Sequence, residues 1–235
     1  MLRVNKLAEL LQNNSYPGRG IMMGLTPDGK KSVSVYFIMG RSVNSRNRVF
    51  KADGSGIRTE AYDIEKLTDP SLVIYSPVRV LDGKTIVTNG DQTDTIIDFL
   101  TQGRSFEDGL RTRAYEPDSP NFTPRISGLL DSDGSYRLSI LKSAGEIESC
   151  RRFFYEYPEP ISGTGHFIHT YMNDGSPLPA FEGEPVAVQT ENDLDSFAAA
   201  IWDGLNFDNK VSLFVRMNCL DSGEYQTVIF NKHIR

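Results

Sequence analysis

Three short segments of this chain carry residues whose types and spacing could do chemistry: residues 40–48, 87–94 and 115–125. Each is rich in polar and charged residues, glycine or proline, and each adjoins an apolar run typical of a β-strand. Polar clusters at strand ends are what a pocket for a charged, hydrogen-bonding small molecule needs. The sequence therefore predicts a small-molecule site assembled from these segments.

Segment 40–48 concentrates positive charge, because Arg41, Arg46 and Arg48 stand close together in a chain whose formal net charge is -6. The planar guanidinium group suits bidentate binding of a phosphate or a carboxylate. The chain has no broad basic stretch that would bind a nucleic acid. The cluster therefore favours a ligand with a single phosphate group.

The other two segments contain residues with two possible roles. Asn89-Gly90 by itself is typical of a turn, but residues 89–94 join a predicted strand to a predicted helix, where backbone N–H groups can bind an anion or a carbonyl oxygen. Glu116 could be a solvated loop acid. It also stands before Pro117 in a proline-rich loop, and a stiff loop can hold a carboxylate in place for general acid–base work.

Other site chemistries have little support in the sequence. The phosphate loop Gly-x-x-x-x-Gly-Lys-Ser/Thr and the nucleophile elbow Gly-x-Ser-x-Gly do not occur. His166 and His169 are three apart in a predicted strand, so they should face opposite sides, which is poor geometry for one metal ion. We therefore expect no metal.

The composition is that of an ordinary globular protein. The chain has 235 residues, of which 39% are hydrophobic and 24% charged, and only two cysteines. It contains no apolar run of roughly 18 residues, no secretory signal and no disulfide framework. We expect one domain over residues 1–235, in the cytoplasm, without a membrane or a nucleic acid as partner.

Periodicity and turn signals predict the elements that must position these segments. The expected helices cover residues 2–12, 91–103, 105–111 and 192–204, with Asp91 and Asn192 as N-caps. The expected strands cover residues 33–37, 72–80, 85–88, 125–130, 137–141, 152–157, 165–171, 211–217 and 225–230. Because hairpins dominate the connections, the order indicates an α+β domain with mainly antiparallel sheets packed by helices.

The polar segments also resemble the motifs of a known family. The similarity rests, in order along the chain, on Tyr16-Pro17-Gly18-Arg19 with Gly24, Arg41-Ser42, Asn47-Arg48, Thr88-Asn89-Gly90, Thr93-Asp94 and Thr123-Pro124-Arg125. Together these resemble the archaeal-type IMP cyclohydrolases. The chain departs from that pattern in an additional N-terminal helix, two extra residues between Ser42 and Asn47, and a longer C-terminal part.

The resemblance implies a fold and a reaction. The fold would be a four-layer αββα sandwich like that of N-terminal-nucleophile hydrolases, without a cleaved nucleophile. The reaction would close the ring of formamidoimidazole carboxamide ribotide to inosine monophosphate and water, the last step of de novo purine synthesis. The enzyme would be a hydrolase acting on cyclic amidine carbon–nitrogen bonds, it would need no cofactor, and we expect a homo-oligomer.

The resemblance also implies roles for individual residues. Four residues match catalytic positions, namely Arg48, Tyr75, Asn89 and Glu116. Glu116 would move protons together with Tyr75, while Arg48 and Asn89 would hold the formyl and carboxamide oxygens. Substrate contacts are expected from Arg19, Arg41, Ser42, Asn47, Thr93, Asp94 and Arg125.

Two other functions stay open at this level. One is an amidohydrolase on the same scaffold, which would need a nucleophile exposed at a processed N-terminus. The other is a non-catalytic purine-nucleotide-binding protein that has kept the pocket. The inserted residues before Asn47 also leave open which of Arg41, Arg46 and Arg48 binds phosphate.

Overall fold

A computed structural model describes residues 4–67, 70, 73–145 and 149–233 of the chain, which form two antiparallel sheets. The strands of the first sheet are, in spatial order, β11 (Val186–Gln189), β10 (Thr164–His169), β1 (Arg19–Leu25), β2 (Lys31–Met39), β12 (Lys210–Cys219) and β13 (Tyr225–Asn231). Those of the second are β3 (Arg48–Asp53), β4 (Gly56–Ala61), β5 (Val78–Leu81), β6 (Lys84–Thr88), β7 (Arg125–Leu130), β8 (Tyr136–Ser143) and β9 (Cys150–Tyr157).

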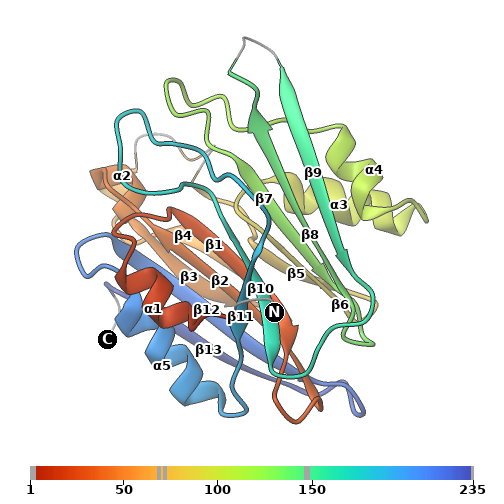
Figure 1. Ribbon diagram of the computed structural model, residues 1–235. Helices are drawn as coiled ribbons and strands as arrows, with labels where there is room; N and C mark the ends of the chain where they lie inside the picture. The colour runs from red at the N-terminus through yellow and green to blue at the C-terminus, as the bar shows by residue number, and fades with distance from the viewer. Residues whose placement is uncertain (1–3, 68–69, 71–72, 146–148, 234–235) are drawn as a thin grey trace.

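Helices cover the outer faces of the two sheets, so the order of layers is helix, sheet, sheet, helix (Figure 1). Helices α1 (Leu7–Gln12) and α5 (Leu194–Gly204) pack on the first sheet through a cluster that includes Leu11, Phe197 and Phe37. Helices α3 (Gln92–Thr101) and α4 (Phe106–Arg111) pack on the second sheet. The two sheets bury a third cluster between them. The α+β fold with mainly antiparallel sheets is therefore confirmed.

The two ends of the sandwich differ in their connections. At one end, which we call the hairpin end, short turns join β1 to β2, β5 to β6, β7 to β8 and β12 to β13. The turn between β5 and β6 has positive φ at both Asp82 and Gly83, as a type I′ hairpin requires. At the other end, the loop end, longer connections include helix α2 (Val43–Arg46) and residues 112–124. The three predicted segments all meet at the loop end.

Most predicted elements are present, and the capping details correct one of them. Asp193, and not Asn192, is the N-cap of α5, because its carboxylate accepts a hydrogen bond from the Ser196 N–H at 2.8 Å. Asp91 occupies the N-cap position of α3 without a side-chain capping bond. Asn192 instead accepts from the backbone N–H of Asp28.

Several expected boundaries were wrong. Helix α1 begins at Leu7, and the first residues of the predicted helix 2–12 lie outside the described part of the chain. Residue 72 of the predicted strand 72–80 lies outside the described part of the chain. Of residues 73–80, only Val78 onward is strand, since the backbone N–H groups of Val73 and Ile74 donate to the Pro70 carbonyl in a turn. Strands β1, β3, β4 and β11 were not predicted. Among the helices that the structure describes, none combines the length and apolar content of a membrane span.

Candidate functional site

A pocket of about 220 Å³ lies at the loop end of the sandwich. It is lined by Tyr16, Arg19, Arg41, Ser42, Ser45, Asp118, Asn121, Thr123, Tyr171 and Leu178. We call it the loop-end pocket. Its lining comes from the start of β1, the end of β2, the connection before β7 and the chain after β10. Antiparallel pairing brings these points together, because Arg19 of β1 stands opposite Ile38 near the end of β2.

Two arginines beside the pocket have guanidinium nitrogens without hydrogen-bond partners. Arg48 is only 1% exposed, and its Nε donates to the Ser45 carbonyl at 2.9 Å. Both terminal nitrogens of Arg48, and Nε of the partly buried Arg19, are buried without a partner among the described residues. A buried polar group without a partner is costly. The arrangement is therefore complementary to an oxygen-rich or anionic ligand.

Glu116 supplies a carboxyl group that is 3% exposed. Burial raises its pKa to about 7, although the positive charges of Arg19 and Arg125 act in the opposite direction. The backbone N–H of Glu116 donates to the Thr123 carbonyl at 2.9 Å, which fixes the start of its loop. A carboxyl group with a pKa near neutrality can both accept and donate a proton at physiological pH.

Tyr75 connects the surroundings of the Glu116 carboxyl group to the core between the sheets. Its hydroxyl lies 2.7 Å from the hydroxyl of Tyr36, and both side chains are buried. Burial raises the pKa of Tyr75, while the charges of Arg48 and Arg19 lower it. The same two arginines and Glu116 are thus close enough to influence Tyr75. These four groups form one electrostatic cluster, with Arg19 also lining the loop-end pocket.

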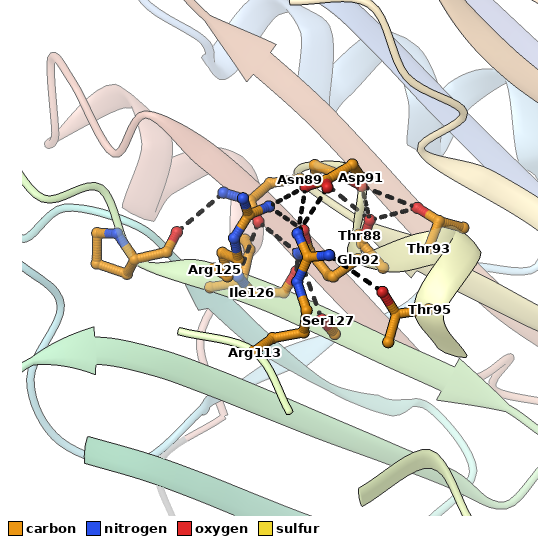
Figure 2. Close-up of polar contacts among 12 residues, drawn as sticks. Thr88, Asn89, Asp91, Gln92, Thr93, Thr95, Arg113, Arg125, Ile126 and Ser127 are labelled. Carbon is orange, nitrogen blue, oxygen red and sulfur yellow. Dashed lines mark hydrogen bonds and ion pairs between the residues drawn. The ribbon is translucent and has the colours of Figure 1, made fainter. Parts of the chain in front are cut away.

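The turn between β6 and α3 is tied to β7 by side-chain hydrogen bonds (Figure 2). Asn89 Nδ2 donates to the Pro124 carbonyl at 2.9 Å, and Asn89 Oδ1 accepts from the Ile126 N–H at 2.9 Å. Asn89 Oδ1 also accepts from Gln92 Nε2 at 3.0 Å. Most of the hydrogen-bonding capacity of Asn89 is therefore used inside the protein, which makes the residue a brace between two segments of the site.

Arg125 lies in the same network (Figure 2). Its Nη1 donates to Gln92 Oε1 at 2.6 Å and is 2.7 Å from Asp91 Oδ1, while Arg113 Nη2 donates to both carboxylate oxygens of Asp91 at 2.6 Å. A Cβ at Gly90 would lie 2.5 Å from Arg125 Nη1 and 3.6 Å from the Glu116 carboxylate. A side chain at position 90 would therefore require the Arg125 guanidinium group to shift.

Four other residues of the polar segments make contacts away from the loop-end pocket. The Asn47 side chain exchanges two hydrogen bonds of 2.7 Å with the backbone of Asp63. Thr93 bonds Thr88 and the Gly90 carbonyl within its own turn. The last two residues bind partners elsewhere: Asp94 pairs with Arg79, and Arg46 donates to Gly40 and Asn209.

Arg41 and Ser42 stand at the mouth of the pocket. Arg41 is partly exposed, pairs with Asp174, and donates to the Gly175 carbonyl at 2.9 Å. Its guanidinium carbon lies 5.0 Å from the centre of the Tyr16 ring. Ser42 caps α2 by accepting from the Ser45 N–H at 3.1 Å. The short helix α2 therefore fixes the position of Arg41 relative to the buried Arg48.

Sequence reasoning missed several residues as parts of the site. Tyr36 was interpreted only as a strand residue, and Tyr171 only as the end of a strand. Tyr171 stacks on Tyr16 with ring centres 5.9 Å apart, and its hydroxyl bonds the hydroxyl of Thr123. Asp118 accepts from the Thr123 N–H at 2.6 Å. A usable signal for Tyr171 was an aromatic residue at the end of a predicted strand.

The described residues contain no group of three or more His, Cys, Asp or Glu side chains that could hold a metal ion. His166 bonds the Tyr136 hydroxyl between the sheets, whereas His169 stacks on Phe167 in the layer facing the helices. The two histidines therefore face opposite sides of β10, as predicted. Burial lowers the pKa of each to about 4.

A model of the family described as IMP cyclohydrolase-like protein matches residues 16–222. A protein named IMP cyclohydrolase from Methanococcus maripaludis strain C7 is 30% identical over 163 residues, covering 65% of this chain and 79% of the relative. One with the same name from Methanopyrus kandleri is 28% identical over 160 residues, covering 66% and 75%. Another, from Methanosphaera stadtmanae, is 28% identical over 163 residues, covering 68% and 75%.

Proposed function

The chain belongs to the IMP cyclohydrolase-like family, and from this premise we propose that it closes the ring of formamidoimidazole carboxamide ribotide to give inosine monophosphate and water. In this proposal the enzyme acts as a cyclohydrolase in the last step of de novo purine synthesis. The observation that carries it is the buried Glu116, whose pKa is about 7, beside arginines with unpartnered nitrogens.

The chemistry sets three requirements. The carboxamide nitrogen attacks the formyl carbon, and an oxyanion develops on the formyl oxygen. That oxygen then leaves as water, with one proton from the carboxamide nitrogen and one from the formamide nitrogen. Because a carboxamide nitrogen is a weak nucleophile, the reaction needs fixed geometry, oxyanion stabilisation and proton transfer.

Glu116 and Arg48 fit the last two requirements. A carboxyl group with a pKa near 7 can take a proton from the attacking nitrogen and return one to the departing oxygen, and Tyr75 can relay it. Arg48 has two buried nitrogens that make no hydrogen bond to the described residues, and these can donate to the developing oxyanion. These donors are held in place before the reaction, because Nε of Arg48 is bonded to Ser45.

The phosphate of the ribotide is assigned to Arg19, Arg41 and Ser42, which line the loop-end pocket. Asn89 and Arg125 are assigned as positioning residues, because their hydrogen bonds hold the turn before α3 against β7. Residues Asn47 and Thr93 are given the same kind of role, and Asp94 is given no contact with the substrate.

A spectroscopic assay of inosine monophosphate formation tests the proposal. We expect purified wild-type protein to turn over the ribotide, and Glu116→Gln to lose roughly 100- to 10,000-fold in turnover while keeping nucleotide affinity. Wild-type protein that binds the nucleotide without turnover would support the non-catalytic alternative. An intact mass showing a processed N-terminal Cys, Ser or Thr would support the amidohydrolase alternative.

A further inference from the structure

A second pocket lies between the two sheets at the hairpin end, opposite the loop-end pocket. Its volume is about 160 Å³, and polar residues in its wall include Ser32, Thr85, Asp131, Arg216, Asn218 and Tyr225. It adjoins an outer hollow of about 700 Å³ that shares Cys219, Gly223 and Tyr225 with it. We call it the hairpin-end pocket. It has room for several water molecules or for one small ionic group.

The pocket contains a buried arginine with unused hydrogen-bonding capacity. Arg216 is 2% exposed, and its Nε donates to Thr227 Oγ1 at 2.9 Å. Its Nη1 is buried and has no hydrogen-bond partner in the part of the chain that the structure describes. The guanidinium carbon lies 4.1 Å from the centre of the Tyr225 ring and 5.2 Å from that of Phe214. The aromatic rings hold the cation in place while leaving a donor free.

No carboxylate in the described ranges pairs with Arg216. Asp131 also lines the pocket, but its two oxygens bind Lys84 and Arg137. The pocket therefore holds a buried positive charge that no carboxylate of the described residues neutralises. An oxyanion would supply both the missing charge and the missing acceptor.

We propose that the hairpin-end pocket is a second ligand site, which binds the phosphate or carboxylate group of a small molecule through Arg216. The anionic group occupies the inner pocket, and the remainder of the molecule extends past Tyr225 into the outer hollow. This site is separate from the loop-end pocket and does not depend on the function proposed for it. Phosphate and carboxylate share the required oxygens, and they differ in charge and in the number of acceptors.

Cys219 provides a local reporter, because it lines both the inner pocket and the outer hollow. Hydrogen bonding by Ser222 lowers the pKa of its thiol, which favours reaction with an alkylating reagent. In a Cys150→Ser chain, alkylation of Cys219 is timed with inorganic phosphate, acetate or chloride at equal ionic strength. We expect saturable slowing by phosphate or acetate, whichever group the site prefers, and none by chloride.

Substitutions at the two ends of the molecule then test whether the anion binds in the hairpin-end pocket. Arg216→Met should weaken the anion affinity that produces the slowing by roughly 10- to 100-fold, the size expected for a charge-assisted hydrogen bond. Asn218→Asp, which places a carboxylate in the same pocket, should weaken the anion affinity as well. Because this variant is isosteric, we expect it to fold, and thermal unfolding is the control. Arg41→Ala should leave the slowing unchanged. Equal slowing in Arg216→Met and the parent chain, or no slowing by either anion, would overturn the proposal.

Discussion

The two ends of the sandwich each bury an arginine with at least one guanidinium nitrogen that has no hydrogen-bond partner among the described residues, yet their surroundings differ. At the loop end, Arg48 shares its environment with Arg19, Tyr75 and Glu116. At the hairpin end, Arg216 meets aromatic rings and hydroxyl groups. Burial lowers the pKa of both arginines. The positive charge of Arg19 lowers the pKa of Arg48 further, whereas Tyr225 acts to raise the pKa of Arg216.

The comparison shows that a buried cation favours the binding of an anion but does not by itself indicate catalysis. Proton transfer needs a group that gains and loses a proton near neutral pH. Glu116 has that property at the loop end, because burial raises its pKa to about 7. At the hairpin end, the carboxylate of Asp131 instead forms ion pairs with Lys84 and Arg137. We therefore expect catalysis at one end and ligand binding alone at the other.

The largest expected effect comes from a matched pair of variants, Arg48→Met and Arg216→Met. Each replaces a buried cation by an apolar side chain of similar length. Arg48→Met should lower turnover by roughly 100- to 1,000-fold, the loss typical of an oxyanion donor. Arg216→Met should leave turnover within about twofold, because it is remote from the loop-end pocket. The ribotide assay on both proteins, with thermal unfolding as the control for folding, measures the contrast.

A turnover loss of the same size in both variants would show that the two ends are not functionally distinct. The assignment of Arg48 would be wrong if Arg48→Met kept full turnover while remaining folded.

The next effect concerns stability. Asn89→Ala leaves the buried Ile126 N–H and Pro124 carbonyl without their side-chain partner, so the free energy of unfolding should fall by about 3 kcal/mol. Asn218→Ala at the hairpin end removes only one bond of 3.3 Å from a half-buried side chain to Ser32, and should cost less than about 1 kcal/mol. Urea denaturation of both variants measures the difference, and equal losses would contradict the bracing role of Asn89.

The contrast between the two ends also explains what the sequence could predict. The loop end is encoded by dense polar segments beside apolar runs, so its residues could be found by composition and spacing. Several of those residues, such as Asn47 and Asn89, bond the protein's own backbone, and a sequence does not say whether an amide faces a ligand or the backbone. That depends on tertiary pairing with Asp63 and with Pro124.

The hairpin end carried no such signal. Arg216 stands in a predicted apolar strand, and the residues that line the pocket with it, such as Ser32, Thr85 and Tyr225, come from three other strands. Strand β1 was missed for a related reason: both of its faces are buried, so it has no alternation of polar and apolar residues. The capping of α5 by Asp193 and not its neighbour shows that helix boundaries also depend on local backbone geometry.

A smaller effect should appear in the pH dependence of stability. The pKa of Glu116 is about 7 in the folded protein and 4.5 in the unfolded reference, so the folded state binds more protons between these values. The free energy of unfolding should therefore fall as the pH rises through this window. Between pH 5 and pH 8 the wild type should lose about 2 kcal/mol more than Glu116→Gln, which cannot ionise.

Urea denaturation across that pH range measures this loss. Glu156→Gln, at an exposed glutamate of β9, is the matched control and should follow the wild type. Parallel pH profiles for the wild type and Glu116→Gln would contradict a raised pKa at Glu116, and the proton carrier would have to be sought elsewhere.

The smallest effect concerns the mouth of the loop-end pocket, where Arg41 is paired with Asp174. An exposed ion pair contributes only about 0–1 kcal/mol, so Arg41 can exchange Asp174 for a phosphate at little cost. Arg41→Ala should raise the KM for the ribotide roughly tenfold with kcat within about threefold, because the lost contact acts equally in the ground and transition states. Asp174→Asn removes the competing carboxylate and should lower KM by roughly two- to threefold. Steady-state kinetics on both variants separates the two directions, and an unchanged KM in Arg41→Ala would assign the phosphate to Arg19 without help from Arg41.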